Sequence, residues 1–244
     1  MARAVRIAGK ILDAVFPRHC ITCGAPNPPG KFRYLCGECA SGPFAHQAAR
    51  CRRCAEIVGG SVDVSGCAKC DGADFFFSAA KVACEYASSG RDLVLELKYR
   101  GGLHVARDMA AICSASAGFA EYFRGAVLVP VPLHRSRLRS RGYNQSEVLC
   151  REIARANPGL GIEVSRILER RKATGTQTAL TRDERAANVR GAFSLSARCS
   201  ASRDAHLIVV DDVMTSGATL NECAKVLRRA GFSSVRVFAF ARRS

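Results

Sequence analysis

The sequence contains no apolar run of about 18 residues, the length at which a helix becomes a candidate for crossing a membrane. Residues 1–16 are basic, but Arg6, Gly9, Lys10 and Asp13 interrupt their apolar positions, so they are a poor match to a secretory signal. Their spacing instead favours a short amphipathic helix. We therefore expect no membrane insertion.

Acidic residues are also scarce. The 244 residues include 21 Asp and Glu against 37 Lys and Arg, which gives a formal net charge of +16. A basic surface favours anionic partners such as nucleic acid or phosphorylated metabolites. Because most of the arginines are dispersed along the chain, a general arginine bias without a polyanionic partner explains this charge equally well.

Cysteine is abundant, but its count of 13 is odd. Five cysteines stand alone, mostly at apolar positions: Cys84, Cys113, Cys150, Cys199 and Cys223. An odd number with isolated thiols is typical of a reducing compartment and argues against a disulfide framework. We therefore expect a cytoplasmic protein.

The other eight cysteines form four C-x-x-C pairs, namely Cys20 with Cys23, Cys36 with Cys39, Cys51 with Cys54, and Cys67 with Cys70. Twelve residues separate the two pairs of each half, and the unit recurs after 31 residues, which indicates a duplicated module. Two pairs supply the four thiolates of a tetrahedral, structural zinc site with no open position. We assign one zinc to each repeat, although spacing alone also allows pairs from different repeats to combine. Redox chemistry is disfavoured, because a thioredoxin-type motif occurs once, in a βαβ context.

Residues 206–220 read HLIVVDDVMTSGATL. Their apolar start predicts a strand buried on both faces at the centre of a parallel sheet. Asp211 and Asp212 follow it, and two adjacent carboxylates suit a pair of vicinal hydroxyls. The next residues, Thr215, Ser216, Gly217, Ala218 and Thr219, form a turn into a helix, whose free amides and hydroxyls make a phosphate cradle. This pattern predicts a site for a 5′-phosphorylated ribose.

Residues 126–134 predict a short strand that must leave the sheet near Pro130 and Pro132. A dense basic loop follows, with Arg135, Arg137, Arg139 and Arg141. Such a loop after a strand end fits pyrophosphate or nucleic acid, and a solvated run of charge is the alternative. Asn144 is the expected cap of a helix that reaches about residue 156.

Helices and strands alternate over residues 75–244. We expect a strand or hairpin over 75–86, a turn at 88–90, and helices over 92–98 and 104–117. A strand over 162–168 is followed by a long polar segment over 170–190, which includes a short helical piece. The chain returns to the sheet at Phe193 and Leu195, and after the strand that begins at His206 come a helix to about 230 and a last strand over 234–241. This order predicts a doubly wound, mainly parallel α/β sheet. The boundary falls near residue 74, after the cysteine-rich module.

Several of these stretches resemble known families. LIVVDDVMTSGAT resembles the signature with which type I phosphoribosyltransferases bind phosphoribosyl pyrophosphate (PRPP). VPVPLHRSRLRSRGYNQS, QTALTRDERAANVRGAF and ELKYRGGLHVA resemble stretches of the ComF family, in which a double zinc ribbon often precedes the domain. The chain is thus identified as a member of that family, with an N-terminal helix and a double zinc ribbon over residues 1–74. A type I phosphoribosyltransferase-like parallel sheet flanked by helices is expected over residues 75–244.

The resemblance implies roles for individual residues. Asp211 and Asp212 would bind the ribose hydroxyls of PRPP, and the turn from Thr215 to Thr219 its 5′-phosphate. Val131, Pro132 and Leu133 fall at the place of the pyrophosphate loop, and residues 170–190 at that of a flexible loop over the site. A magnesium ion would bridge pyrophosphate and ribose oxygens.

Three functions follow from the resemblance. The first is a PRPP-binding accessory protein that handles incoming single-stranded DNA in natural transformation, with the DNA or the uptake machinery as partner. The second is an active phosphoribosyltransferase that uses an unidentified base or amine. The third is a zinc-stabilised scaffold with a relic site. The sequence has no tryptophan, and no aromatic or polar segment follows its last expected strand, which weakens the enzyme hypothesis and leaves catalytic residues unassigned.

Overall fold

The computed structural model describes residues 18–27, 30–42, 49–58, 67–68, 70, 72–172 and 182–243. All structural statements below refer to these residues. The expected N-terminal helix and the middle of the polar segment, residues 173–181, lie outside them.

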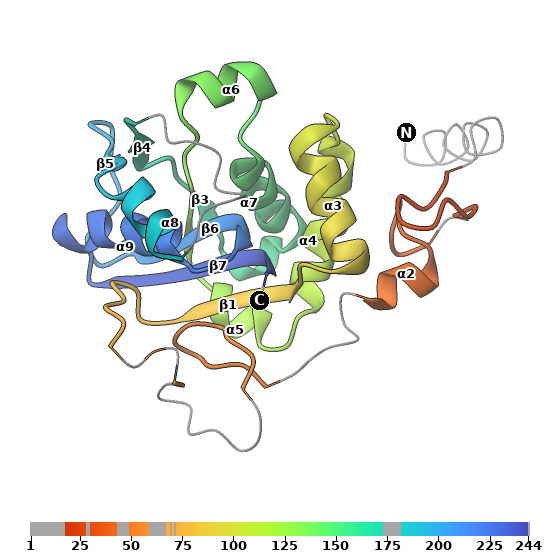
Figure 1. Ribbon diagram of the computed structural model, residues 1–244, viewed down its shortest axis with the longest axis horizontal. Coiled ribbons are helices and arrows are strands. Elements are labelled where there is room, and N and C mark those ends of the chain that lie inside the picture. The colour runs from red at the N-terminus through yellow and green to blue at the C-terminus, as the bar shows by residue number, and fades with distance from the viewer. Residues whose placement is uncertain are drawn as a thin grey trace.

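A five-stranded sheet forms the centre of the molecule (Figure 1). Its strands are β1 (Ala80–Glu85), β2 (Val127–Pro130), β3 (Glu163–Val164), β6 (His206–Met214) and β7 (Ser234–Arg242). The order is β1-β7-β6-β2-β3, and every neighbouring pair is parallel. The expected parallel α/β sheet is confirmed, with β6 in its middle.

Helices cover both faces of this sheet. On one face lie α3 (Ser88–Tyr99), α4 (Ala106–Ala115), α5 (Phe119–Phe123) and α7 (Gln145–Ala156). On the other face lie α8 (Arg182–Val189) and α9 (Ala218–Arg229). Single 3₁₀ turns occur at η2 (Leu103–Val105) and η3 (Pro158–Leu160). Alternate residues of β6 supply the two cores. Ile208 and Val210 pack with α3, α4 and α7, while Leu207 and Val209 pack with α9. This is why an unbroken apolar run suits the central strand.

A small second sheet corrects two expectations. β4 (Leu168–Arg170) and β5 (Phe193–Leu195) pair with each other, antiparallel, apart from the main sheet. The expected return of Phe193 and Leu195 to the main sheet is therefore wrong, and the expected strand over 162–168 divides into β3 and β4. Leu168 and Phe193 are buried in the core on the α9 side. A short apolar run does not reveal which sheet it will join.

The basic segment that was expected to be a loop is a helix, α6 (Arg135–Arg141). It projects beyond the neighbouring elements in Figure 1. It begins where the imidazole of His134 accepts the amide of Ser136 at 3.3 Å, and it ends at Gly142, whose φ is +83°. Arginine is a good helix former, so these two ends are enough to order the segment. In the same way, the expected turn at 88–90 is the first turn of α3.

The two cysteine repeats share the backbone turn at their first C-x-x-C pair, but among the described residues only the first repeat ends in a helix, α2 (Gly37–Ser41). His19 bridges Pro26 in the first repeat, and Arg50 bridges Ile57 in the second, each 31 residues further along. The duplication predicted from the spacing is therefore visible in the backbone.

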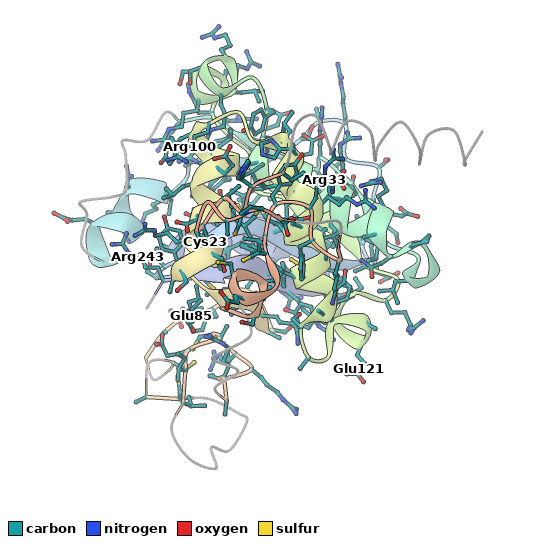
Figure 2. All side chains as sticks on the ribbon, turned by 90° about the vertical axis from the view of Figure 1, so that its right-hand side faces the viewer. Cys23, Arg33, Glu85, Arg100, Glu121 and Arg243 are labelled. Atoms are coloured by element: carbon teal, nitrogen blue, oxygen red, sulfur yellow. The ribbon has the colours of Figure 1, made fainter. Side chains whose placement is uncertain are left out.

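Each repeat contacts the α/β domain through its own polar contacts. The carboxylate of Asp108 on α4, 2 % exposed, accepts the amides of Arg33 (3.0 Å) and Tyr34 (2.7 Å). In the second repeat, Arg50 pairs with Glu85 at the end of β1. Figure 2 shows Arg33 on the first repeat and Glu85 above the second. No helix in the described part of the chain is long and apolar enough to span a bilayer.

Candidate functional site

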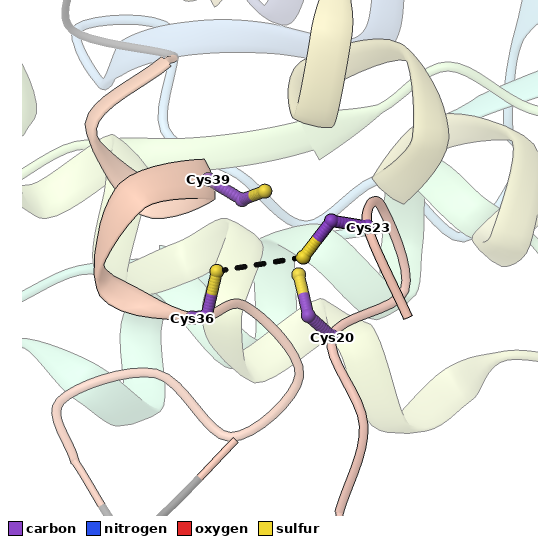
Figure 3. A group of neighbouring side chains, drawn as sticks. All are labelled: Cys20, Cys23, Cys36 and Cys39. Carbon is purple, nitrogen blue, oxygen red and sulfur yellow. Dashed lines mark hydrogen bonds between the residues drawn. The ribbon is translucent and has the colours of Figure 1, made fainter. Parts of the chain in front are cut away.

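Eight cysteine thiols gather in two groups of four. Figure 3 shows the first group, and the sulfur atoms within each group all lie within 4.8 Å of one another. The groups are Cys20, Cys23, Cys36 and Cys39, and Cys51, Cys54, Cys67 and Cys70. Each group thus comes from one repeat, as assigned from the spacing, and pairs from different repeats are not combined.

The sulfur separations fit a metal better than a disulfide. Cys23 and Cys36 are 3.7 Å apart, and Cys54 and Cys67 are 3.6 Å apart. Four sulfurs that each lie about 2.3 Å from a tetrahedral zinc are roughly 3.8 Å from one another, whereas disulfide-bonded sulfurs are about 2 Å apart. Both groups therefore have the dimensions of a four-thiolate zinc site.

The chemistry around Cys20 also favours a metal ligand. Burial raises the pKa of this thiol, but hydrogen bonds from the backbone amides of Cys36, Cys23 and Thr22 outweigh burial and lower the pKa to about 7. Because the thiolate is the form that binds zinc, these amides prepare the residue for its role.

A cavity of about 260 Å³ lies at the carboxyl end of β6. It brings together most of the residues that the sequence singled out for PRPP: Asp211, Asp212, Thr215, Ser216, Gly217, Ala218, Thr219, Val131 and Leu133. Pro132 lines a neighbouring cavity instead. In a parallel sheet this edge is where ligands bind, because the strand ends and the helix starts meet there.

The two carboxylates lie within β6, which continues to Met214, and not after its end as expected. Asp212 is 2 % exposed, and its Oδ1 lies 3.0 Å from Nζ of Lys98. Its Oδ2 is buried and has no hydrogen-bond partner among the described residues. Leaving a buried acceptor unpaired costs about 1–3 kcal/mol, and a ribose hydroxyl or a bound cation would satisfy it. The site therefore fits a magnesium-bound sugar phosphate.

Asp211 has different partners. It accepts hydrogen bonds from the Ser146 hydroxyl at 2.9 Å and from the Asp212 amide at 2.9 Å. Burial raises the pKa of Asp211, the charge of Asp212 adds to this, and the attraction of Lys98 opposes it, so that its pKa is about 7. The adjacent carboxylates thus differ in environment, although the sequence presents them as a pair.

Lys98, at the end of α3, is a site residue whose role the sequence did not reveal. In the sequence, Lys98 and Arg100 stand at the end of an expected helix, where binding of a phosphate and capping of the helix explain them equally well. Burial lowers the pKa of Lys98, but the charges of Asp212 and Asp211 more than offset this and raise it. Lys98 thus stays a cation inside the cavity, whereas Arg100 does not line it. Which helix end reaches β6 depends on the tertiary structure.

The turn after β6 is shaped for an anion. Gly217 has a φ of +78°, a left-handed conformation that favours glycine, and the flexible end of Met214 packs against it. Its neighbour Ala218 begins the 12-residue helix α9, and Gly217 offers no side chain to cap it. The amides of this first turn and the positive end of the helix dipole therefore point to a phosphate group.

The four arginines of α6 do not act as one group. Arg137 and Arg141, four residues apart and so on one face of the helix, line the cavity at β6. Arg141 donates to Gln145 at 2.6 Å and lies 5.6 Å from the centre of the Tyr99 ring. Arg135 lines the neighbouring cavity, and Arg139 lines neither.

The fold and the site define a phosphoribosyltransferase-like protein that carries a double zinc ribbon. In agreement, residues 11–72 match the double zinc ribbon domain, and residues 140–244 match the phosphoribosyl transferase domain. Together with the relatives described next, these matches show that the chain belongs to the ComF family, as the sequence motifs predicted.

Three curated relatives illustrate the family. Competence protein F of Haemophilus influenzae is 38 % identical over 116 residues, 47 % of this chain and 49 % of that protein. DNA utilization protein YhgH of Escherichia coli K12 is 31 % identical over 163 residues, 65 % of this chain and 69 % of that protein. Competence protein ComFC of Streptococcus pneumoniae is 26 % identical over 157 residues, 64 % of this chain and 65 % of that protein. The match thus spans about half of the first and about two thirds of the others.

Among solved structures, a hypoxanthine phosphoribosyltransferase from Staphylococcus aureus aligns with a TM-score of 0.34 and 10 % identity, over 57 % of this chain and 64 % of that chain. This likeness is too distant to support an argument about function.

Proposed function

We propose that this protein binds PRPP with magnesium in the cavity at the end of β6, and that it assists the handling of single-stranded DNA during natural transformation. The observation that carries the first part is that Asp212, whose buried Oδ2 has no hydrogen-bond partner among the described residues, lines the same cavity as the first turn of α9. PRPP carries hydroxyls for the carboxylate and a phosphate for the helix start.

The residues of the cavity divide between the parts of PRPP. Asp211 and Asp212 hold the ribose hydroxyls, and the turn from Thr215 to Thr219 holds the 5′-phosphate. The loop formed by Val131, Pro132 and Leu133 holds the pyrophosphate, and Arg137 and Arg141 neutralise its charge together with Lys98. Magnesium, when bound, supplies further neutralisation of the pyrophosphate oxygens.

The DNA part of the proposal is supported by the relatives and by charge. The relatives include two competence proteins and a DNA utilization protein. The formal net charge of +16 suits a polyanion, and the free thiols of the single cysteines suit the cytoplasm. We propose that the protein acts there on incoming strands.

An active phosphoribosyltransferase is the alternative, and the environment of Asp211 favours it. A pKa of about 7 is close to the value that suits proton transfer at neutral pH. An amine acceptor would form a bond to the anomeric carbon while the bond to pyrophosphate breaks, and the amine proton would leave to a base. Release of pyrophosphate from PRPP in the presence of a panel of bases would decide for this alternative.

Thermal unfolding with magnesium and PRPP tests the site. A ligand at a hundredfold excess over its dissociation constant stabilises by about 2.7 kcal/mol, which for a protein of this size is roughly 5–10 °C. We expect such a rise in the wild type and its loss in Asp212→Asn. The control is Asp204→Asn, because Asp204 is an exposed acid just before the other end of β6.

No rise in the wild type, or an equal rise in Asp212→Asn, would contradict the proposed PRPP site. Calorimetric titration at 15 to 20 °C separates a lost ligand from a destabilised variant, because Asp212→Asn also removes the partner of Lys98.

A further inference from the structure

A second and larger cavity, of about 830 Å³, lies beside the candidate PRPP cavity. Its walls come from α6, α7, β4 and the end of β2, and it shares Leu133 and Arg170 with its neighbour. Its volume is in the range of cavities that hold a nucleotide-sized molecule. Pro132 and Leu133 of the proposed pyrophosphate loop reach it, but none of the roles described so far accounts for the rest of its lining.

Its charge is strongly positive. Five arginines line it, Arg135, Arg151, Arg166, Arg170 and Arg171, against two acids, Glu147 and Glu169. Glu147 is engaged by Arg151 at 2.9 Å and by Arg166. By contrast, the guanidinium groups of Arg135 and Arg171 form no hydrogen bond or ion pair with any described residue. Two arginines with unused donors favour a phosphate or carboxylate ligand.

Another part of the lining is apolar. Leu133, Val148 and Leu168 contribute to it, and Leu138 of α6 is 42 % exposed. The hydroxyl of Tyr143 is bonded to the carbonyl of Leu97, which holds the ring in place. A small anion such as inorganic phosphate would leave this surface in water, so the ligand also has an apolar body.

The acidic residue Glu169 adds hydrogen-bond acceptors to the lining of the second cavity. Glu169 accepts one hydrogen bond, from the Ser196 hydroxyl at 2.9 Å, and a carboxylate has capacity for more. A ligand that fits the cavity therefore combines an anionic end, an apolar body and N–H donors. A nucleotide has all three, in its phosphate, the face of its base and the edge of its base.

We infer that this second cavity binds a nucleotide, with its phosphate on Arg135 and Arg171 and its base against Leu138. Helix α6 then separates two ligands: Arg137 and Arg141 face PRPP, and Arg135 faces the nucleotide. The inference adds a second site to the proposed function, and it rests on that function for the identity of the neighbouring ligand and for the handling of DNA. A free mononucleotide and one unit of a DNA strand present the same chemistry.

Calorimetric titration of the full-length, zinc-loaded protein tests this inference, with thymidine 5′-monophosphate as the probe. We expect binding to the wild type and at least tenfold weaker binding to Arg135→Glu combined with Arg171→Glu. Leu138→Asp should cause a similar loss, since it removes the apolar contact. Arg139→Glu is the matched control, because Arg139 lies on the same helix, is exposed and lines neither cavity, so its affinity should stay within twofold of wild type.

Three further ligands sharpen the test. Thymidine without phosphate and inorganic phosphate should each bind at least tenfold more weakly than the nucleotide, since each lacks one half of the contacts. An oligothymidylate identifies the source: binding of the oligomer alone, lost in the same variants, assigns a unit of a strand, and binding of both probes assigns the free nucleotide as well.

The inference is overturned if neither probe binds, or if the variants of Arg135, Arg171 and Leu138 bind both probes as the wild type does. Titration of the wild type with magnesium and PRPP keeps the two proposals distinguishable. PRPP binding without nucleotide binding removes only this inference. Nucleotide binding without PRPP binding removes the PRPP part of the proposed function instead.

Discussion

Asp211 and Asp212 are neighbours in the chain, but the structure gives them different surroundings. Asp212 pairs with Lys98, which comes from α3, more than one hundred residues earlier in the chain. Asp211 receives a hydroxyl from Ser146, at the start of α7. The charge of Lys98 compensates the buried carboxylate of Asp212, whereas Asp211 has no such partner at contact distance in the described part of the chain and its pKa is raised. Neither contact has a signature in the sequence around the two acids.

The raised pKa of Asp211 predicts a pH dependence of stability. Its pKa is about 7 in the folded protein against a usual value of 3.8, so ionisation favours the unfolded chain. Stability from this group is complete below about pH 4 and is lost as the pH rises towards and through 7. We expect the melting temperature of Asp211→Asn to exceed that of the wild type at pH 8 by at least about 3 °C, and to approach it at pH 5.

The melting temperatures of wild type and Asp211→Asn are compared on protein that starts zinc-loaded and ligand-free. Any loss of zinc at low pH then lowers both melting temperatures alike. Asp204→Asn, which removes an exposed acid before the same strand, should keep the pH profile of the wild type. Parallel profiles for wild type and Asp211→Asn would show that the Asp211 carboxyl titrates as an ordinary acid.

At the scale of elements, the turn after the first C-x-x-C pair has one geometry in both cysteine repeats but is built from different residues. The residue after the second cysteine is Gly24 in the first repeat, with a φ of +73°, and Ala55 in the second, with a φ of +59°. Both amides return to the first cysteine of their pair, at 2.8 Å in each case. The turn therefore requires a left-handed residue, which glycine adopts without strain.

Gly24→Ala should therefore destabilise the first repeat. Nothing lies within 4 Å of a Cβ at this position, so the expected cost of about 1–2 kcal/mol comes from the backbone alone. Denaturant unfolding and zinc release to a chelator measure it. The control is Gly37→Ala in α2, where a Cβ also meets nothing within 4 Å and φ is not positive, and which should be neutral or slightly stabilising. Equal effects of both substitutions would disprove the requirement.

Two elements show which predictions a local sequence pattern supports and which it does not. Asn144 was predicted as a helix cap, and its side chain accepts the amide of Ser146 at 3.1 Å. The prediction of α7 is confirmed, because a cap and the helix it begins are adjacent in the chain. Phe193 was assigned to the wrong sheet, because the choice of strand partner depends on residues far away.

At the scale of the whole molecule, contacts connect the second cysteine repeat to the edge of the candidate PRPP cavity. Arg242, 6 % exposed at the end of β7, donates to the carbonyl of Cys54 at 2.9 Å and to Glu56 at 2.5 Å. The next residue, Arg243, lines the cavity at β6, and its amide bonds to Met214 at 2.9 Å. The second repeat thus holds the end of β7 by a buried ionic contact, and the residue next to that contact bonds to the end of β6. The predicted boundary near residue 74 stays a prediction.

The net charge, also a property of the whole molecule, predicts how DNA binding responds to salt. A single strand that contacts about four phosphates should bind roughly fiftyfold more weakly at 200 mM than at 50 mM salt, because counterions are released on binding. Fluorescence anisotropy of a labelled oligothymidylate measures this. A peptide nucleic acid of the same sequence is the control, since it has the bases without the charge and should show no such slope. Affinity that does not change with salt would rule out the DNA proposal.

Two features were readable from the sequence alone. The four C-x-x-C pairs predicted both cysteine groups, since a knuckle, its turn and its partner knuckle lie within one short segment. The run from His206 to Thr219 predicted a central strand, a turn and a helix start, which are also contiguous. The tertiary structure alone decided the pairing of Lys98 with Asp212, the division of the α6 arginines between two cavities, and the second cavity itself. Those contacts join residues far apart in the chain, so no local periodicity or spacing records them.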